Sequence, residues 1–143
     1  MDNNLKKSII MEHYQRPLNK GLVDDESYEK ININSPTCID NINYMIKIED
    51  GIIEDVKFDG EACAISTSAS SIILDMIKGK SKEDALNIIN NYEAMINEKP
   101  YDKDIFKEAL VYDEIYKQAN RKKCALMPYE AVKEILEKDD DNV

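Results

Sequence analysis

Two runs of alternating apolar residues, separated by the dipeptide Asp50-Gly51, constrain the fold more than any other feature of the sequence. The runs are residues 41–49, NINYMIKIE, and residues 52–59, IIEDVKFD. Asp-Gly is a strong hairpin signal because both positions tolerate a positive φ. The pattern predicts an antiparallel hairpin with one buried face. The residues that we expect on that face are Ile42, Tyr44, Ile46, Ile48, Ile52, Val56 and Phe58.

The rest of the chain predicts a third strand and several helices around this hairpin. Residues 28–34, YEKININ, extend the sheet, and the later segments change to helical periodicity. The sequence therefore indicates an α+β domain spanning 1–143, with a small antiparallel sheet of about three strands covered on one face by helices. The first expected helix covers residues 4–16 and ends at Pro17, and the second runs from about Gly60 to Gly79. A third starts at Ser81, with Asp84 as its capping partner, and a fourth covers about 102–119. The last has Pro128 in its first turn and buries Val132, Ile135 and Leu136.

The charge and hydropathy of the chain exclude several classes of function. A net charge of −10 argues against nucleic acids and anionic membranes as partners, because phosphate binding needs a basic surface. The longest apolar runs are far shorter than the ~20 residues of a membrane span. The N-terminus carries no secretory signal pattern, so we expect a cytoplasmic protein. Residues 138–143 form an acidic end that we expect to be flexible.

The three cysteines, Cys38, Cys63 and Cys124, raise the question of chemistry. An odd number cannot pair fully, and disulfides are rare in cytosolic proteins. Cys38 and Asp40 precede the first hairpin strand, and Cys63 follows the second. Because a hairpin returns to its origin, we expect these three residues at one end of the sheet. Cys124 reaches the same end if the last helix packs back on the sheet with its N-terminus there.

Such a cluster is suited to a soft or borderline metal. Sulfur ligands favour zinc, cuprous copper or iron–sulfur clusters. We expect Cys63 and Cys124 at helix N-termini, which lower the pKa of a thiol, and Arg121, Lys122 and Lys123 add positive charge. Asp40 is a harder ligand, which we expect to be the easier one to displace.

Two simpler interpretations of these residues stay open at this point. Three unrelated buried thiols would need no metal, and no CxxC pair is present to argue otherwise. His13, the only histidine, is more often a core or surface residue than part of a site.

Four separated motifs give the sequence a family resemblance. HYQRPLNKG, SPTCID, FDGEACAISTSAS and RKKCAL occur in an order similar to that of the iron–sulfur scaffold family of IscU and the NifU N-terminal domain. The long interval between Cys63 and Cys124, with a segment near 90–106 that resembles an insertion, points to the SufU branch. Lys123, directly before Cys124, and Arg121 fit the R-x-K-C pattern of that branch.

The resemblance implies a site and partners for the chain. It implies metal ligands at Cys38, Asp40, Cys63 and Cys124, with a SufE/NifU-like fold. It implies a SufS-like cysteine desulfurase, a pyridoxal-phosphate enzyme, as partner, and downstream iron–sulfur assembly proteins. For SufU-like members it implies a held zinc, with Cys38 as the persulfide acceptor and Arg121 holding the anionic site or docking the partner.

The resemblance also leaves rivals and two departures. The same ligands could carry a transient [2Fe–2S] cluster or iron in a scaffold. They could also hold a purely structural zinc. If the chain has an enzymatic role, it is at most that of a sulfurtransferase acting with a cysteine desulfurase. Ile39 and Ala62 stand where the family prefers glycine. Both concern the geometry of the site, and Ile39 could shield Cys38.

Overall fold

The computed structural model describes residues 1–34 and 39–141, without the side chain of residue 141. It contains a three-stranded sheet, four α-helices and three short 3-10 helices in that part of the chain. The elements are α1 (Asn3–Gln15), β1 (Tyr28–Asn34), β2 (Asn41–Glu49), β3 (Ile52–Glu61), α2 (Ala64–Ile77), α3 (Lys82–Ile96), η1 (Lys103–Ile105), η2 (Glu108–Tyr112), η3 (Ile115–Lys117) and α4 (Ala119–Asp141).

The sheet confirms the expected strands and hairpin. Its order is β1-β2-β3, and both pairings are antiparallel. Asp50 and Gly51 form the turn with φ values of 52° and 75°, the left-handed conformation that the dipeptide favours. The buried face carries Ile42, Tyr44 and Ile46 of β2, none more than 1% exposed.

One residue of the expected buried face is placed wrongly. Ile52 is 41% exposed, whereas Ile53 is fully buried. The pairing between β2 and β3 shifts at Lys47 and Ile48, so Glu54 is an extra residue on β3. Such a bulge reverses the alternation on one side of it. The alternation of residues 52–59 alone does not reveal where that reversal occurs.

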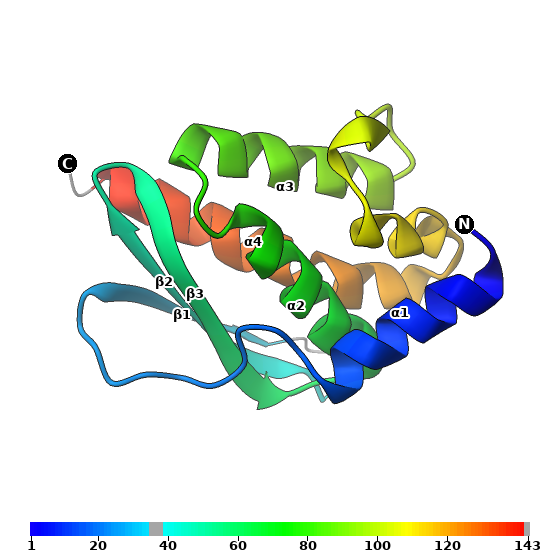
Figure 1. The fold of residues 1–143 in the computed structure, drawn as a ribbon, viewed down its shortest axis with the longest axis horizontal. Coiled ribbons are helices and arrows are strands. Elements are labelled where there is room, and N and C mark those ends of the chain that lie inside the picture. Colours follow the sequence, from blue (N-terminus) through cyan, green and yellow to red (C-terminus); the bar gives the residue numbers. More distant parts are fainter. Residues whose placement is uncertain (35–38, 142–143) are drawn as a thin grey trace.

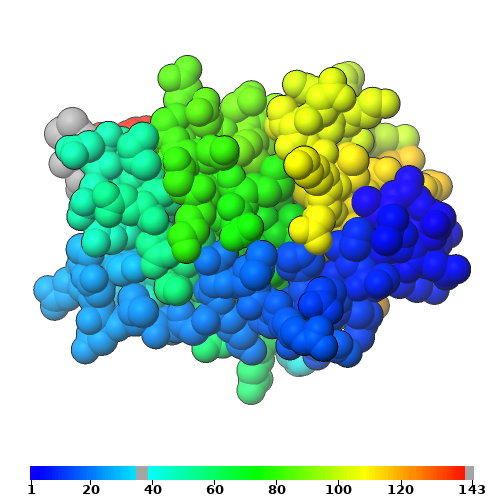
Figure 2. Space-filling view, viewed as in Figure 1, coloured from blue at the N-terminus to red at the C-terminus, as the bar shows by residue number. Residues whose placement is uncertain are grey.

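The helices cover one face of the sheet (Figure 1), as the sequence predicts. α2 and α4 lie against the strands, and α3 packs on the outside of this pair. α2 is buried along most of its length, including the fully buried serines Ser66, Ser68, Ser70 and Ser71. Figure 2 shows the N-terminal part of the chain, in blue, along one side of the molecule, next to residues of α2 and α3 in green.

The expected ends hold for α1 and α2, and the expected start holds for α3. The expected start of the second helix, near Gly60, is too early, because β3 continues through Glu61 and α2 begins at Ala64. α1 ends two residues before Pro17, and Gly79 follows α2 with a φ of 84°. The side chain of Ser81 accepts a hydrogen bond from the backbone N–H of Asp84 and so caps α3.

The predicted helix over 102–119 is wrong. The chain forms η1, η2 and η3 there, separated by extended or irregular residues such as Phe106 and Lys107. Phe106 packs edge-on against Tyr92 of α3, and Tyr112 does the same from the next turn. Burying both rings against α3 outweighs the weak preference of this segment for a continuous helix.

The prediction that Pro128 opens the last helix is also wrong. α4 begins at Ala119, so Pro128 lies inside it and Cys124 lies beyond its first turn. A proline within a helix cannot donate to the carbonyl four residues back. The buried hydroxyl of Tyr92 donates 2.7 Å to the carbonyl of Ala125, one residue beyond the carbonyl that Pro128 cannot reach.

Two further features concern the ends and surface of the described chain. α4 continues through residue 141, and the ammonium group of Lys82 donates 2.6 Å to the carboxylate of Asp139. No helix among residues 1–34 and 39–141 is long and apolar enough to cross a membrane.

Candidate metal centre

Asp40 and Cys63 meet where the β2–β3 hairpin enters and leaves the sheet. Asp40 directly precedes β2, and Cys63 follows β3 at the N-cap of α2. The backbone N–H of Cys63 donates 2.7 Å to Asp40 Oδ1, and Cys63 Sγ lies 3.7 Å from Asp40 Oδ2. Asp40 is only 2% exposed. The hairpin therefore brings these two side chains together as the sequence predicts.

Cys124 completes a cluster of three from a different element. One ligand atom each of Asp40, Cys63 and Cys124 lies within 4.8 Å of the other two. Cys124 reaches this point from α4, which packs along α2. Cys63 and Cys124 are thiols and form no disulfide. Cys38, the fourth expected ligand, lies outside the described residues.

The surroundings of Cys124 differ from the sequence prediction. It is 5% exposed and lies inside α4, so its thiol does not sit at a helix N-terminus. Burial raises the pKa of the Cys124 thiol, and the nearby Cys63 and Asp40 raise it further. A divalent cation would remove this obstacle, because its charge offsets the thiolates and the carboxylate.

Two basic residues expected to support the site lie outside the cluster. Arg121 and Lys123 are exposed on the first turns of α4. Arg121 lines a groove of about 630 Å³ that also includes Ala64 and Ile65, the residues after Cys63. Its two expected roles, holding the anionic site and docking a partner, remain predictions.

Ser66 is a residue of the site that sequence reasoning missed. Its hydroxyl donates 2.6 Å to Asp40 Oδ2, and its backbone N–H donates 3.4 Å to Cys63 Sγ. The signal was present in the sequence, since Ser66 stands three residues after the N-cap Cys63, where capping partners occur.

The two departures from the family pattern have different surroundings. Ile39 is 77% exposed, so its side chain points largely into solvent beside the buried Asp40. Ala62 is half-buried and packs against the core. Neither removes a member of the cluster.

The donor set fits a zinc-like metal. In a tetrahedral zinc site with bonds of about 2.0–2.3 Å, ligand atoms lie roughly 3.3–3.8 Å apart. Three ligand atoms within 4.8 Å of one another need only small side-chain adjustments to reach that spacing. Two sulfurs with one carboxylate oxygen suit zinc or iron rather than magnesium or calcium, which prefer oxygen ligands.

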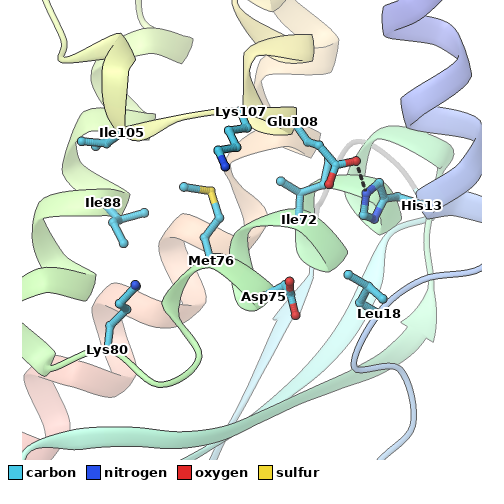
Figure 3. A pocket seen from close by; sticks show the side chains of 10 residues that line it. All are labelled: His13, Leu18, Ile72, Asp75, Met76, Lys80, Ile88, Ile105, Lys107 and Glu108. Carbon is cyan, nitrogen blue, oxygen red and sulfur yellow. Dashed lines mark hydrogen bonds and ion pairs between the residues drawn. The ribbon is translucent and has the colours of Figure 1, made fainter.

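His13 has a separate role in the fold. Its Nδ1 lies 2.7 Å from the hydroxyl of Ser71, and its Nε2 lies 2.9 Å from the carboxylate of Glu108. Figure 3 shows it at one side of a pocket of about 330 Å³, with Ile72 and Met76 of α2 on the pocket wall. None of the three cluster residues lines this pocket. The two contacts of His13 connect α1 with α2 and η2.

Comparison with known proteins agrees with the geometry. The model of the NifU-like N-terminal domain matches residues 5–125. The zinc-dependent sulfurtransferase SufU of Bacillus subtilis is 34% identical over 139 residues, covering 96% of this chain and 93% of that protein. The iron–sulfur cluster assembly scaffold protein IscU of Streptococcus pyogenes serotype M1 is 34% identical over 138 residues, covering 95% and 85%.

A solved structure extends the likeness to three dimensions. It is the crystal structure of a candidate iron–sulfur cluster assembly scaffold protein for the SUF system from Fervidobacterium islandicum AW-1. It superposes with a TM-score of 0.78 at 26% identity, covering 90% of this chain and 93% of that one. The fold, the Asp-Cys-Cys cluster and these similarities agree. The chain belongs to the NifU-like N-terminal domain family.

Proposed function

We propose that this protein acts in cytoplasmic iron–sulfur cluster assembly as a zinc-dependent acceptor of sulfur from a cysteine desulfurase. The observation that carries this proposal is the convergence of Asp40, Cys63 and Cys124, whose ligand atoms lie within 4.8 Å of one another. The similarity to the Bacillus subtilis sulfurtransferase over nearly the whole chain supports the same assignment.

The cluster would hold the metal, with Cys38 as its fourth ligand. Four ligands close a tetrahedral zinc site. When bound, zinc keeps its cysteine ligands deprotonated and protected from oxidation. Asp40, Cys63 and Cys124, which are held by the hairpin, α2 and α4, would bind the metal, and Cys38 would supply the reacting thiolate.

The transfer is an exchange between a thiolate and a persulfide, and it needs no oxidant or reductant. The Cys38 thiolate attacks the outer sulfur of a persulfide on the desulfurase. The sulfur–sulfur bond of that persulfide breaks, the desulfurase cysteine leaves as a thiolate, and Cys38 carries the persulfide. The attacking group must be a thiolate, which is the form that metal ligation preserves.

The surface beside the cluster offers a docking area for the desulfurase. The groove that contains Ala64 and Ile65 is lined by apolar side chains and by the charged residues Lys6, Lys7, Glu114, Lys117 and Arg121. Glu114 forms ion pairs with Lys6 and Lys117. Ile39, directly before Asp40, adds an exposed apolar side chain. On a chain of net charge −10, the further basic side chains Lys7 and Arg121 of this groove favour an acidic surface of the partner.

A second candidate function is a scaffold that builds a [2Fe–2S] cluster on the same four residues. The name of the Streptococcus pyogenes relative, which has the same 34% identity as the sulfurtransferase, favours it. A carboxylate among the ligands would make the cluster easier to pass on.

The test is metal analysis followed by sulfur transfer. Protein purified without added metal should contain near-stoichiometric zinc and little iron, whereas brown protein would favour the scaffold. With a cysteine desulfurase and cysteine, mass spectrometry should find one added sulfur atom on Cys38, and Cys38→Ala should abolish stimulation of the desulfurase. Full stimulation by Cys38→Ala would reject the acceptor role.

A charge reversal tests the docking surface separately. Arg121→Glu should raise the desulfurase concentration needed for half-maximal stimulation by about tenfold, with a stronger effect at low salt. Lys103→Glu makes the same change of charge on η1, away from the groove, and serves as the control. Equal behaviour of the two variants would remove the groove from the interface.

A further inference from the structure

The first turn of α2 holds both carboxylate oxygens of Asp40. Oδ1 accepts a hydrogen bond of 2.7 Å from the backbone N–H of Cys63, and Oδ2 accepts one of 2.6 Å from the hydroxyl of Ser66. Asp40 is 2% exposed and Ser66 is fully buried. Water therefore has little access to replace either hydrogen bond, and the carboxylate is held in one orientation.

These contacts form a helix cap that passes through Asp40. In a capping box, the N-cap side chain accepts from the N–H three residues on, and that residue's side chain accepts from the N-cap N–H. Here Cys63 Sγ accepts from the Ser66 N–H at 3.4 Å. The second half of the box is replaced by Asp40, which accepts hydrogen bonds from the backbone N–H of Cys63 and from the hydroxyl of Ser66.

The cap uses the same atoms that the metal site needs. Asp40 and Cys63 are two of the three clustered ligands, and Ser66 joins them without being a ligand itself. The Ser66 hydroxyl has one proton, and it lies 2.6 Å from Asp40 Oδ2 and 3.5 Å from Cys63 Sγ. The shorter contact directs that proton toward Asp40 Oδ2, so the hydroxyl donates to the carboxylate and holds it in place. Ser66 also contacts the Cys124 thiol, where it can only accept while its proton is directed at Asp40.

We propose that Ser66 is a positioning residue that fixes Asp40 as a metal ligand. The inference rests on the metal site of the proposed function. It also revises the expectation that Asp40 is the ligand most easily displaced, because a carboxylate bound at both oxygens has lost the freedom to swing away. Loss of a hydrogen-bond partner of a metal ligand typically lowers metal affinity 10–100-fold.

The main test compares Ser66→Ala with Ser70→Ala. Both variants remove a fully buried hydroxyl from α2, but Ser70 contacts the hydroxyl of Tyr44 at 2.7 Å and not a member of the cluster. In competition with a chromogenic chelator, Ser66→Ala should bind Zn²⁺ about 10–100-fold more weakly than the unmodified protein. Ser70→Ala should stay within about threefold, even though both variants lose stability.

A spectroscopic measurement separates positioning from general loosening of the fold. Co²⁺ in place of zinc gives visible absorption bands that report its ligands. These bands should shift or weaken in Ser66→Ala and remain unchanged in Ser70→Ala. The pair Ser66→Thr and Ser66→Val adds a second comparison, because the two side chains have nearly the same shape and only threonine retains the hydroxyl. Ser66→Thr should bind Zn²⁺ more tightly than Ser66→Val by at least tenfold.

The outcomes distinguish this inference from the proposed function. If the unmodified protein binds Zn²⁺ and Co²⁺ but Ser66→Ala matches it in affinity and spectrum, the role of Ser66 is rejected and the proposed function stands. Equal binding by Ser66→Thr and Ser66→Val rejects the same role. If the unmodified protein binds neither metal, the proposed function falls, and the role of Ser66 falls with it.

Discussion

Gly60 of β3 lies directly against the backbone of Asn41 at the start of β2. A Cβ atom added at Gly60 would be 2.1 Å from the carbonyl oxygen of Asn41, and the φ of Gly60 is +149°. Only glycine fits both the space and the conformation without strain. This close approach lies between Asp40 and Cys63, and it allows the ends of the hairpin to come together at the cluster.

Gly60→Ala should therefore destabilise the protein by about 2–3 kcal/mol, because the added methyl group forces the backbone of Asn41 to move. It should also lower zinc retention, since the Asn41 that must move directly follows Asp40. Gly51→Ala is the matched control, because Gly51 also has a positive φ but has open space around it. Its cost should be about 1 kcal/mol, without loss of metal. Urea denaturation and metal analysis measure both, and equal costs for the two variants would contradict the steric argument.

The hydroxyl pair of Tyr44 and Ser70 should show strong coupling in a double-mutant cycle. Both residues are fully buried, and their oxygens lie 2.7 Å apart between β2 and α2. Tyr44→Phe or Ser70→Ala alone leaves one buried hydroxyl without its partner, at a cost of about 1–3 kcal/mol. The double variant should cost less than the sum of the two single changes. Additive costs in urea denaturation would mean that water or another group satisfies the remaining hydroxyl.

His13→Gln should lower stability without changing metal content. The imidazole loses its contacts with Ser71 and Glu108, and burial of the remaining polar groups should cost about 1–3 kcal/mol. Glu108→Gln, which changes only the half-exposed end of this network, should cost less than about 1 kcal/mol. A loss of zinc in His13→Gln at temperatures where the variant is folded would show that His13 contributes to the metal centre after all.

Glu29 should make stability fall as the pH rises through neutrality. Burial raises the pKa of Glu29 from its ordinary 4.5 to about 7, and the nearby Asp139 raises it as well. The folded state therefore binds more protons than the unfolded state between these two values, so the free energy of unfolding decreases as pH rises from about 4.5 to 7 and then levels off. Solvent screening limits the effect to about 1 kcal/mol, because Glu29 is partly exposed.

Urea denaturation at pH 5 and pH 8 checks this dependence. Glu29→Gln cannot titrate, so its stability relative to the unmodified protein should be greater at pH 8 than at pH 5. Glu26→Gln, at an exposed position on the segment before β1, should show no such difference. A pH-independent difference between Glu29→Gln and the unmodified protein would show that Glu29 titrates normally in the folded state.

Local chemistry determined most of the elements of this fold. The Asp50-Gly51 turn, the cap formed by Ser81 and the stop before Pro17 each depend on a few neighbouring residues, and the structure places all three as the sequence predicts. The pairing of Asp40 with Cys63 follows as well, because the two ends of a hairpin must meet. These features require only backbone geometry and short-range hydrogen bonding.

Long-range packing determined the rest. The bulge at Glu54, the 3-10 turns that bury Phe106 and the continuation of α4 past Pro128 all depend on surfaces formed by distant parts of the chain. Periodicity describes a segment alone and carries no information about those surfaces. The position of Cys124 belongs to this group, since only the packing of α4 along α2 brings its sulfur to the hairpin. The sequence alone thus determined which residues have the chemistry of a metal site, and the tertiary structure decided that three of them share one small volume.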